Sequence, residues 1–151
     1  DKKINFYLLG STKSSSDFLQ KNYLKNLSKK NNNVIWMGEV KSLRKIYQLS
    51  DIILVLSYYG EGIPKVILES TYYSKTIISY NVPGCRDVVK KNINGYLVKI
   101  YDKKSVCLII EMLYRNRKLL KKNLNISKKF AINNFGINHV KLVYEKINNQ
   151  F

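Results

Sequence analysis

Two acidic residues around a predicted helix start carry the most chemical information in this sequence. Glu61 lies between Gly60 and Gly62, and Glu69 follows after seven intervening residues. The glycines let the backbone approach a ligand closely, and Pro64 suits the first turn of a helix. The free N–H groups of such a turn favour an anion such as a diphosphate. A carboxylate does not help to bind that anion. Glu61 beside the turn is therefore better suited to ligand hydroxyl groups or to a developing positive charge.

Glu69 is expected about two helical turns beyond Glu61. Its long side chain can lean back toward the helix start and accept hydrogen bonds from a ribose. The spacing supports an alternative equally well, in which both acids are solvated residues that merely stabilise the helix start. The sequence pattern therefore indicates an anion-binding and hydroxyl-binding site without proving one.

Short apolar runs that alternate with amphipathic segments predict the elements that position these acids. The strands are expected at Ile4–Leu9, Val34–Met37, Asp51–Leu56, Thr76–Ser79 and Tyr96–Val98, with Asp51–Leu56 the clearest buried strand. This alternation predicts an α/β fold, a Rossmann-like parallel sheet with helices on both faces. Ligands of such sheets bind at the carboxyl ends of the strands, which would place Gly10, Gly38 and the loop 57–62 along one rim.

The composition limits the class of protein. Its 151 residues suit one compact domain, and its formal charge is 27 − 10 = +17. That charge indicates either a polyanionic partner or a general preference of this chain for lysine, and both interpretations stay open. Cys85 and Cys107 fall in different predicted elements without a Cys or His at ligand spacing, so neither a disulfide framework nor a zinc site is expected. No apolar run is long enough to predict a membrane span.

Other chemically capable residues have plainer interpretations. The single histidine, His139, falls in or beside a predicted terminal helix, where a surface or core role is expected. Cys85 is expected to be an ordinary loop thiol. Tyr58 and Tyr59 could border a bound sugar or simply pack at the rim of the sheet.

The segment around the two acids resembles a known family motif. Glu61 and Glu69 with their seven intervening residues are similar to the E-x7-E motif of family 4 retaining glycosyltransferases. The flanking segments resemble that family in the same order along the chain; they are Val34–Gly38, Asp51–Ser57, Thr76–Ser79 with Val82–Val89, and Asn94–Val98. The resemblance runs from about Phe6 to Tyr144.

The resemblance implies a fold and a role for each residue. Family members have the GT-B fold, and this chain resembles its C-terminal, nucleotide-sugar-binding half. The resemblance makes Glu61 the catalytic-site acid beside the donor sugar, and makes Glu69 the ligand of the ribose hydroxyls. The residues implied in donor binding are Glu69, Gly10, Gly38, Glu39, Val40, Gly60, Gly62, Ile63, Pro64, Lys65 and Val66.

The implied reaction moves a sugar from a UDP- or GDP-sugar to a saccharide or a polyprenyl- or lipid-linked acceptor, with retention at the anomeric carbon. No metal and no cofactor is expected, and nucleic acid is not expected as a partner. Capsule, lipopolysaccharide or glycoprotein-glycan assembly would each fit. A cytoplasmic location is expected, with peripheral contact to the anionic inner face of the membrane.

One departure from the family bears on activity. The family has an Arg and a Lys after the first strand of this domain that neutralise the donor diphosphate, and the chain starts at what resembles the second strand. We therefore expect residues 1–151 to be a single domain that lacks the acceptor domain and that first strand. Such a chain should bind donor weakly and should not transfer sugar.

Two alternatives remain at this point. A related GT-B enzyme such as a nucleotide-sugar epimerase would be expected to carry other catalytic acids and a histidine. A basic nucleic-acid-binding module would need a basic face with interleaved aromatic residues, and the acidic motif would then be a coincidence.

Overall fold

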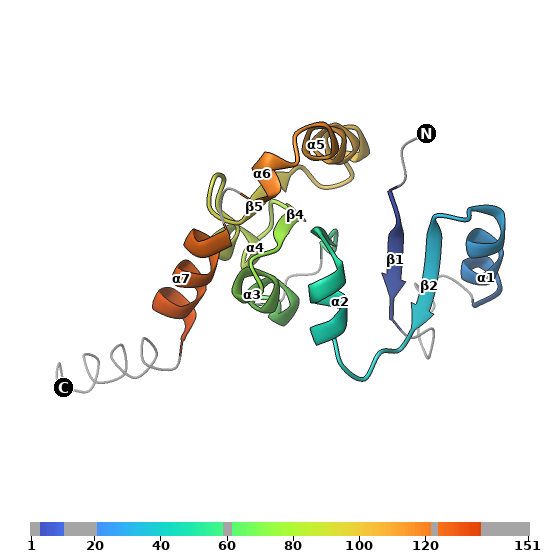
Figure 1. Cartoon of the computed structure of the whole chain (residues 1–151), viewed down its shortest axis with the longest axis horizontal. Coiled ribbons are helices and arrows are strands. Elements are labelled where there is room, and N and C mark those ends of the chain that lie inside the picture. The colour runs from blue at the N-terminus through green and yellow to red at the C-terminus, as the bar shows by residue number, and fades with distance from the viewer. Residues whose placement is uncertain (1–3, 11–20, 59–61, 122–123, 137–151) are drawn as a thin grey trace. The chain divides into compact units, whose positions relative to one another are not determined.

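The structure is a computed structural model, which describes residues 4–10, 21–58, 62–121 and 124–136. The chain forms two compact units, residues 1–44 and residues 45–151. The strands and helices are labelled in Figure 1.

The first unit contains two parallel strands and one helix. β1 (Phe6–Leu9) pairs with β2 (Val34–Gly38), and α1 (Lys21–Lys30) connects them and packs against β2 through the buried Leu24. At the carboxyl ends of these strands, the backbone N–H of Gly10 donates to the carbonyl of Gly38 at 2.9 Å. Gly38 has a φ of 65°, a conformation that glycine adopts without strain. The expected rim position of Gly10 beside Gly38 is thus confirmed within this unit.

The second unit contains a three-stranded parallel sheet in the order β3-β4-β5. Its elements in chain order are α2 (Arg44–Leu49), β3 (Ile52–Val55), α3 (Lys65–Tyr72), β4 (Thr76–Tyr80), α4 (Cys85–Val88), β5 (Gly95–Val98), α5 (Lys103–Arg115), α6 (Lys118–Lys121) and α7 (Leu124–Phe135). Helices cover both faces of this sheet. Successive side chains of a strand point to opposite faces, and Ile77 and Ile78 of β4 are both fully buried.

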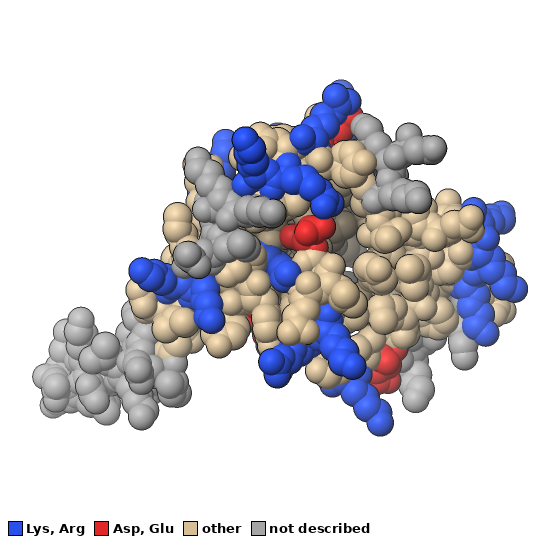
Figure 2. All heavy atoms as spheres, viewed as in Figure 1, with Lys and Arg blue, Asp and Glu red and all other residues tan. Residues whose placement is uncertain are grey.

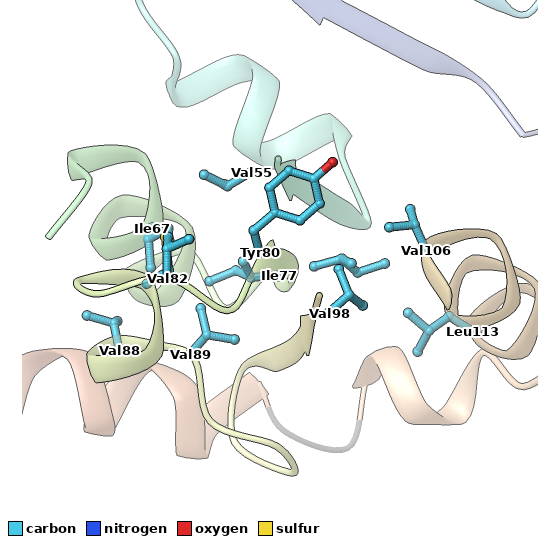
Figure 3. Close-up of a cluster of buried hydrophobic side chains, with 12 residues drawn as sticks. Val55, Ile67, Ile77, Tyr80, Val82, Val88, Val89, Val98, Val106 and Leu113 are labelled. Atoms are coloured by element: carbon cyan, nitrogen blue, oxygen red, sulfur yellow. The ribbon is translucent and has the colours of Figure 1, made fainter. Parts of the chain in front are cut away.

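The core forms around β4. Ile67 of α3 and Val82 lie on one side of Ile77, and Val106 and Leu113 of α5 lie toward the other side (Figure 3). On the first side α7 packs against α3. The α/β architecture with covered faces agrees with the sequence prediction.

The prediction that Asp51–Leu56 is the clearest buried strand is wrong. In β3 only Val55 is buried, and Leu54 is 38% exposed. The reason is that β3 lies at the edge of the three-stranded sheet, whereas the central strand β4 has a neighbour on each side.

The Asn94-Gly95 pair is more than a turn before a strand. The Asn94 side chain is buried; it donates to the Thr71 hydroxyl at 3.0 Å and to the carbonyl of Val88 at 2.9 Å. A Cβ atom on Gly95 would stand 2.1 Å from the carbonyl oxygen of Ile77, so only glycine fits this pairing with β4. The pair therefore fixes β5 in register and ties it to α3.

Candidate functional site

Among the described residues, no side chain caps the start of α3. Pro64 immediately precedes the helix with φ −63° and ψ 128°, and it has no side-chain oxygen with which to cap it. The N–H of Ile67 makes the first bond, to the carbonyl of Pro64 at 2.9 Å. The N–H groups of Lys65 and Val66 precede that bond, as the first donors of a helix do. With the helix dipole they form a location that favours an anion.

Glu69 lies one turn into the same helix and is held from two sides. The Tyr47 hydroxyl donates to Glu69 Oε2 at 2.9 Å, and Lys65 Nζ lies 3.5 Å from Glu69 Oε1. The Glu69 side chain is 31% exposed and that of Lys65 is 88% exposed. The carboxylate therefore has one oxygen fixed from the interior and the other directed to a loose, solvated ion pair. The predicted lean of Glu69 toward the helix start agrees with this contact to Lys65.

Tyr47 comes from α2 and is buried. Its ring stacks on that of Tyr73, with centroids 5.1 Å apart and an angle of 15° between the planes. Burial, and then the hydrogen bond to the Glu69 carboxylate, raise the pKa of the Tyr47 phenol far above its ordinary value. Tyr47 therefore stays a hydrogen-bond donor throughout the neutral range.

A second group of aromatic residues lies at the carboxyl end of the β3-β4-β5 sheet. The Tyr101 ring contacts the Tyr58 ring, with 5.6 Å between centroids, and the Tyr80 ring, with 6.3 Å. A hydrogen bond with Tyr58 raises the pKa of Tyr101. Tyr101 adopts a φ of 63°, which is uncommon for a bulky side chain. Of the two interpretations of Tyr58, packing at the rim is thus observed, and contact with a sugar stays a prediction.

The remaining predicted donor residues divide into two groups. Gly62, Ile63, Pro64, Lys65 and Val66 lie together at the start of α3, and Ile63 is 39% exposed. Gly10 and Gly38 lie together in the first unit, where Glu39 and Val40 follow β2.

Some predicted residues fall outside the described part of the chain. They are Gly60 and the predicted catalytic Glu61, together with Tyr59 and His139. Cys85 is described, and its thiol is buried in the core at the start of α4, so it is not an ordinary loop thiol.

Comparisons with known proteins decide the family. Residues 1–130 match the family described as "Glycosyl transferases group 1". The chain belongs to this family. Its α/β fold with a Rossmann-like parallel sheet agrees with that of solved glycosyltransferases.

The chain is similar to particular family members over most of its length. It is 28% identical over 117 residues to the Campylobacter jejuni GalNAc-α-(1→4)-GalNAc-α-(1→3)-diNAcBac-PP-undecaprenol α-1,4-N-acetyl-D-galactosaminyltransferase, a match that covers 76% of this chain and 32% of that enzyme. The crystal structure of Anabaena HepE in complex with UDP superposes with a TM-score of 0.79 at 17% identity, covering 97% of this chain and 41% of HepE.

A solved single domain also matches. The C-terminal domain of the group 1 glycosyltransferase LpcC from Francisella tularensis has a TM-score of 0.65 at 21% identity, covering 78% of this chain and 63% of that domain. By comparison, the chain spans about a third of the length of the Campylobacter enzyme.

Tyr47 and Tyr73 are the site residues that the sequence did not reveal. Nothing in the spacing of Tyr47 along the sequence shows where its hydroxyl points. The fold brings it to Glu69, 22 residues away along the chain.

The described residues contain neither a metal-binding cluster nor a membrane-spanning helix. Among them, no group of three or more His, Cys, Asp or Glu side chains could hold a metal ion. None of the described helices is both long and apolar enough to cross a membrane.

Proposed function

We propose that this chain is the donor-binding part of a retaining glycosyltransferase and that it binds a UDP- or GDP-sugar at the start of α3. The observation that carries the proposal is the pairing of a helix N-terminus that no described side chain caps with a fixed carboxylate one turn further, at Glu69. Membership in the group 1 family supports the same assignment.

The two halves of this arrangement suit the two polar parts of a nucleoside diphosphate. Lys65 and the N–H groups of Lys65 and Val66 would bind the diphosphate, since they combine a cation with the positive end of the helix dipole. Glu69 would accept hydrogen bonds from the ribose diol. Lys65 and Glu69 lie one helical turn apart, about 6 Å along the axis. A nucleoside diphosphate likewise carries its anion and its diol on one ribose, so a single ligand can meet both residues.

The other residues predicted from the sequence keep their proposed roles. Glu61 would lie beside the donor sugar as the catalytic acid, with Gly60 and Gly62 allowing close approach of the backbone. Gly10, Gly38, Glu39 and Val40 would contact the nucleotide. In the transfer step, the bond from the anomeric carbon to the diphosphate breaks and a bond to the acceptor oxygen forms on the same face. The acceptor proton goes to the departing diphosphate, and protein groups position and neutralise it.

The relatives and the charge support a proposal for the acceptor and the location. The Campylobacter enzyme is named for an undecaprenyl-diphosphate-linked acceptor, which supports a lipid-linked saccharide here, as in surface-polysaccharide or glycan assembly. Coverage of about a third of that enzyme supports a longer protein that has a separate acceptor domain. The net charge of +17 favours contact with the anionic cytoplasmic leaflet.

The described basic residues do not form one single cluster on the face in Figure 2. Figure 2 shows Lys and Arg side chains in several separate groups on the face it presents. This distribution suits a general attraction to an anionic surface better than recognition of one nucleic-acid strand. Sedimentation of the full-length protein with vesicles of anionic lipid at low salt would test the membrane contact, and its absence there would end this part of the proposal.

Titration with UDP, GDP and a short oligonucleotide tests donor binding. We expect one of the two nucleotides to bind, and Glu69→Gln to weaken it about 10- to 100-fold, because a charge-assisted acceptor is lost. Glu111→Gln is the matched control, since Glu111 also forms an i,i+4 ion pair on a helix, with Arg115 at 2.7 Å. The proposal would be wrong if the chain bound the oligonucleotide but neither UDP nor GDP, and if Glu69→Gln left that binding unaltered.

A further inference from the structure

Among the described residues, the hydrogen bond from the Tyr47 hydroxyl is the strongest interaction of the Glu69 carboxylate. Its 2.9 Å hydrogen bond reaches Oε2, whereas the Lys65 ammonium lies 3.5 Å from Oε1 on an 88% exposed side chain. An exposed pair of that kind restrains a carboxylate weakly. The orientation of Glu69 is therefore set by Tyr47.

Tyr47 is itself held in place firmly enough to orient another group. It is 2% exposed, and its ring stacks on Tyr73 of the segment that ends α3. Tyr73 in turn meets the Tyr72 ring edge-on at 5.5 Å. Tyr47 and its partner rings are thus anchored to the same helix that carries Glu69, so the phenol and the carboxylate keep a fixed relation.

The hydrogen bond leaves acceptor capacity for a ligand. A carboxylate offers about four lone-pair sites, and Tyr47 occupies one of them on Oε2. Lys65 can leave Oε1 at little cost because its side chain is solvated. Both oxygens can then accept from a pair of vicinal hydroxyl groups. Without Tyr47 the carboxylate could rotate about its side-chain bonds, and a ligand would have to supply that ordering entropy.

We propose that Tyr47 is a positioning residue that holds the Glu69 carboxylate in the plane required to accept both hydroxyl groups of a ribose. This inference rests on the proposed donor site. The buried phenol does not touch the nucleotide and acts only through Glu69. The alternative is that this hydrogen bond only joins α2 to α3. Its loss would then lower the stability of the protein without changing ribose binding.

Selectivity for the ribose diol separates the two roles. The dissociation constants of UDP or GDP, whichever binds, and of its 2′,3′-dideoxy analogue are measured for four proteins. These are the unaltered chain, Tyr47→Phe, Glu69→Gln and Tyr73→Phe. Tyr47→Phe keeps the stacked ring and removes only the hydroxyl. The ratio of the two constants is insensitive to partial unfolding, because unfolding weakens both nucleotides equally.

We expect Tyr47→Phe to weaken the ribonucleotide about 3- to 10-fold and to leave the dideoxy analogue unchanged. Glu69→Gln should abolish most of the preference for ribose. Tyr73→Phe, which removes a hydroxyl from the adjacent ring, should keep it. An unchanged ratio in Tyr47→Phe, whatever its melting temperature, would overturn the positioning role while Glu69→Gln still supported the donor site. A ratio near one in the unaltered chain would overturn both proposals.

Discussion

Helices α3 and α5 begin in opposite ways, and the difference separates a structural helix start from one available to a ligand. At α5 the Asp102 carboxylate accepts from the Ser105 backbone N–H at 3.0 Å and from the Ser105 hydroxyl at 2.6 Å. At α3 the preceding residue is Pro64, whose side chain carries no acceptor. Asp102 thus caps α5, whereas no described side chain caps α3.

The ion pairs on the two helices differ in the same sense. On α5 the acid comes first, and Arg115 lies 2.7 Å from Glu111, in the order that the helix dipole favours. On α3 the cation comes first, and Lys65 lies 3.5 Å from Glu69, in the reverse order. A lysine in the first turn opposes the dipole and gains little within the protein. Helix stability therefore does not explain Lys65, and under the proposed function its partner is the diphosphate.

The largest expected effect comes from the core residues that anchor the two helices. Ile67 of α3 and Leu113 of α5 are both 0% exposed. Replacing either by Ala should lower the free energy of unfolding by about 2–5 kcal/mol, through lost burial and the cavity left behind. Urea denaturation measures both.

These core variants also sharpen the comparison. We expect similar losses of stability from the two helices, but weaker nucleotide binding only from Ile67→Ala, because Ile67 supports the proposed site. If either variant is too unstable to study, Ile67→Val creates a smaller cavity and should lower the free energy of unfolding by about 0.5–1.5 kcal/mol. A loss below about 1 kcal/mol for both Ala variants would contradict the described core.

A smaller effect is expected from the cap of α5. Hydrogen bonds from the Ser105 hydroxyl and backbone N–H hold the pKa of Asp102 below its ordinary value. Because the folded-state pKa is the lower one, the charged cap stabilises the protein above about pH 4 and loses that contribution as the pH falls through the folded-state pKa.

Thermal melts of Asp102→Ala test this cap. At neutral pH the melting temperature should fall by a few degrees, and the difference from the unaltered chain should shrink as the pH falls below about 4. Nucleotide affinity should not change. A difference that stays constant between pH 7 and pH 3 would show that the charge of Asp102 does not contribute to the cap.

The sequence predicted the parts of the fold that depend on local pattern. The strands, the helix after Pro64 and the chain's α/β class follow from apolar runs and from turn residues that act over a few positions. The burial of β3 was overestimated because apolar content cannot tell an edge strand from a central one. Strand order depends on contacts between distant segments, and the single sequence does not encode these in any local spacing.

The candidate site divides in the same way. The positions of Gly62 to Glu69 around one helix start could be predicted, because they depend on spacing within that helix and the loop before it. Tyr47 could not, because its role depends on a hydroxyl that meets Glu69 only after α2 packs beside α3. The buried Asn94 likewise looked like a turn residue, and only the fold shows its side chain bound to Thr71.

The smallest expected change in stability is that of Lys65, and it probes the open start of α3 most directly. Because the Lys65 side chain is 88% exposed and its pair with Glu69 is loose, Lys65→Gln should change the free energy of unfolding by less than about 0.5 kcal/mol. Arg115→Gln removes the shorter ion pair on α5 and is the matched control. It should lower the free energy of unfolding by as much as Lys65→Gln does, or slightly more.

Binding should separate these two variants where stability does not. If the start of α3 receives a diphosphate, Lys65→Gln should weaken the nucleotide several-fold and reduce the dependence of its affinity on salt, because one cation near the phosphates is lost. Arg115→Gln should change neither. Calorimetric titrations at about 50 and 300 mM salt measure both quantities. Equal salt dependence in the unaltered chain and in Lys65→Gln would mean that the lysine does not meet the diphosphate, and its unfavourable place in the first turn of α3 would then need another cause.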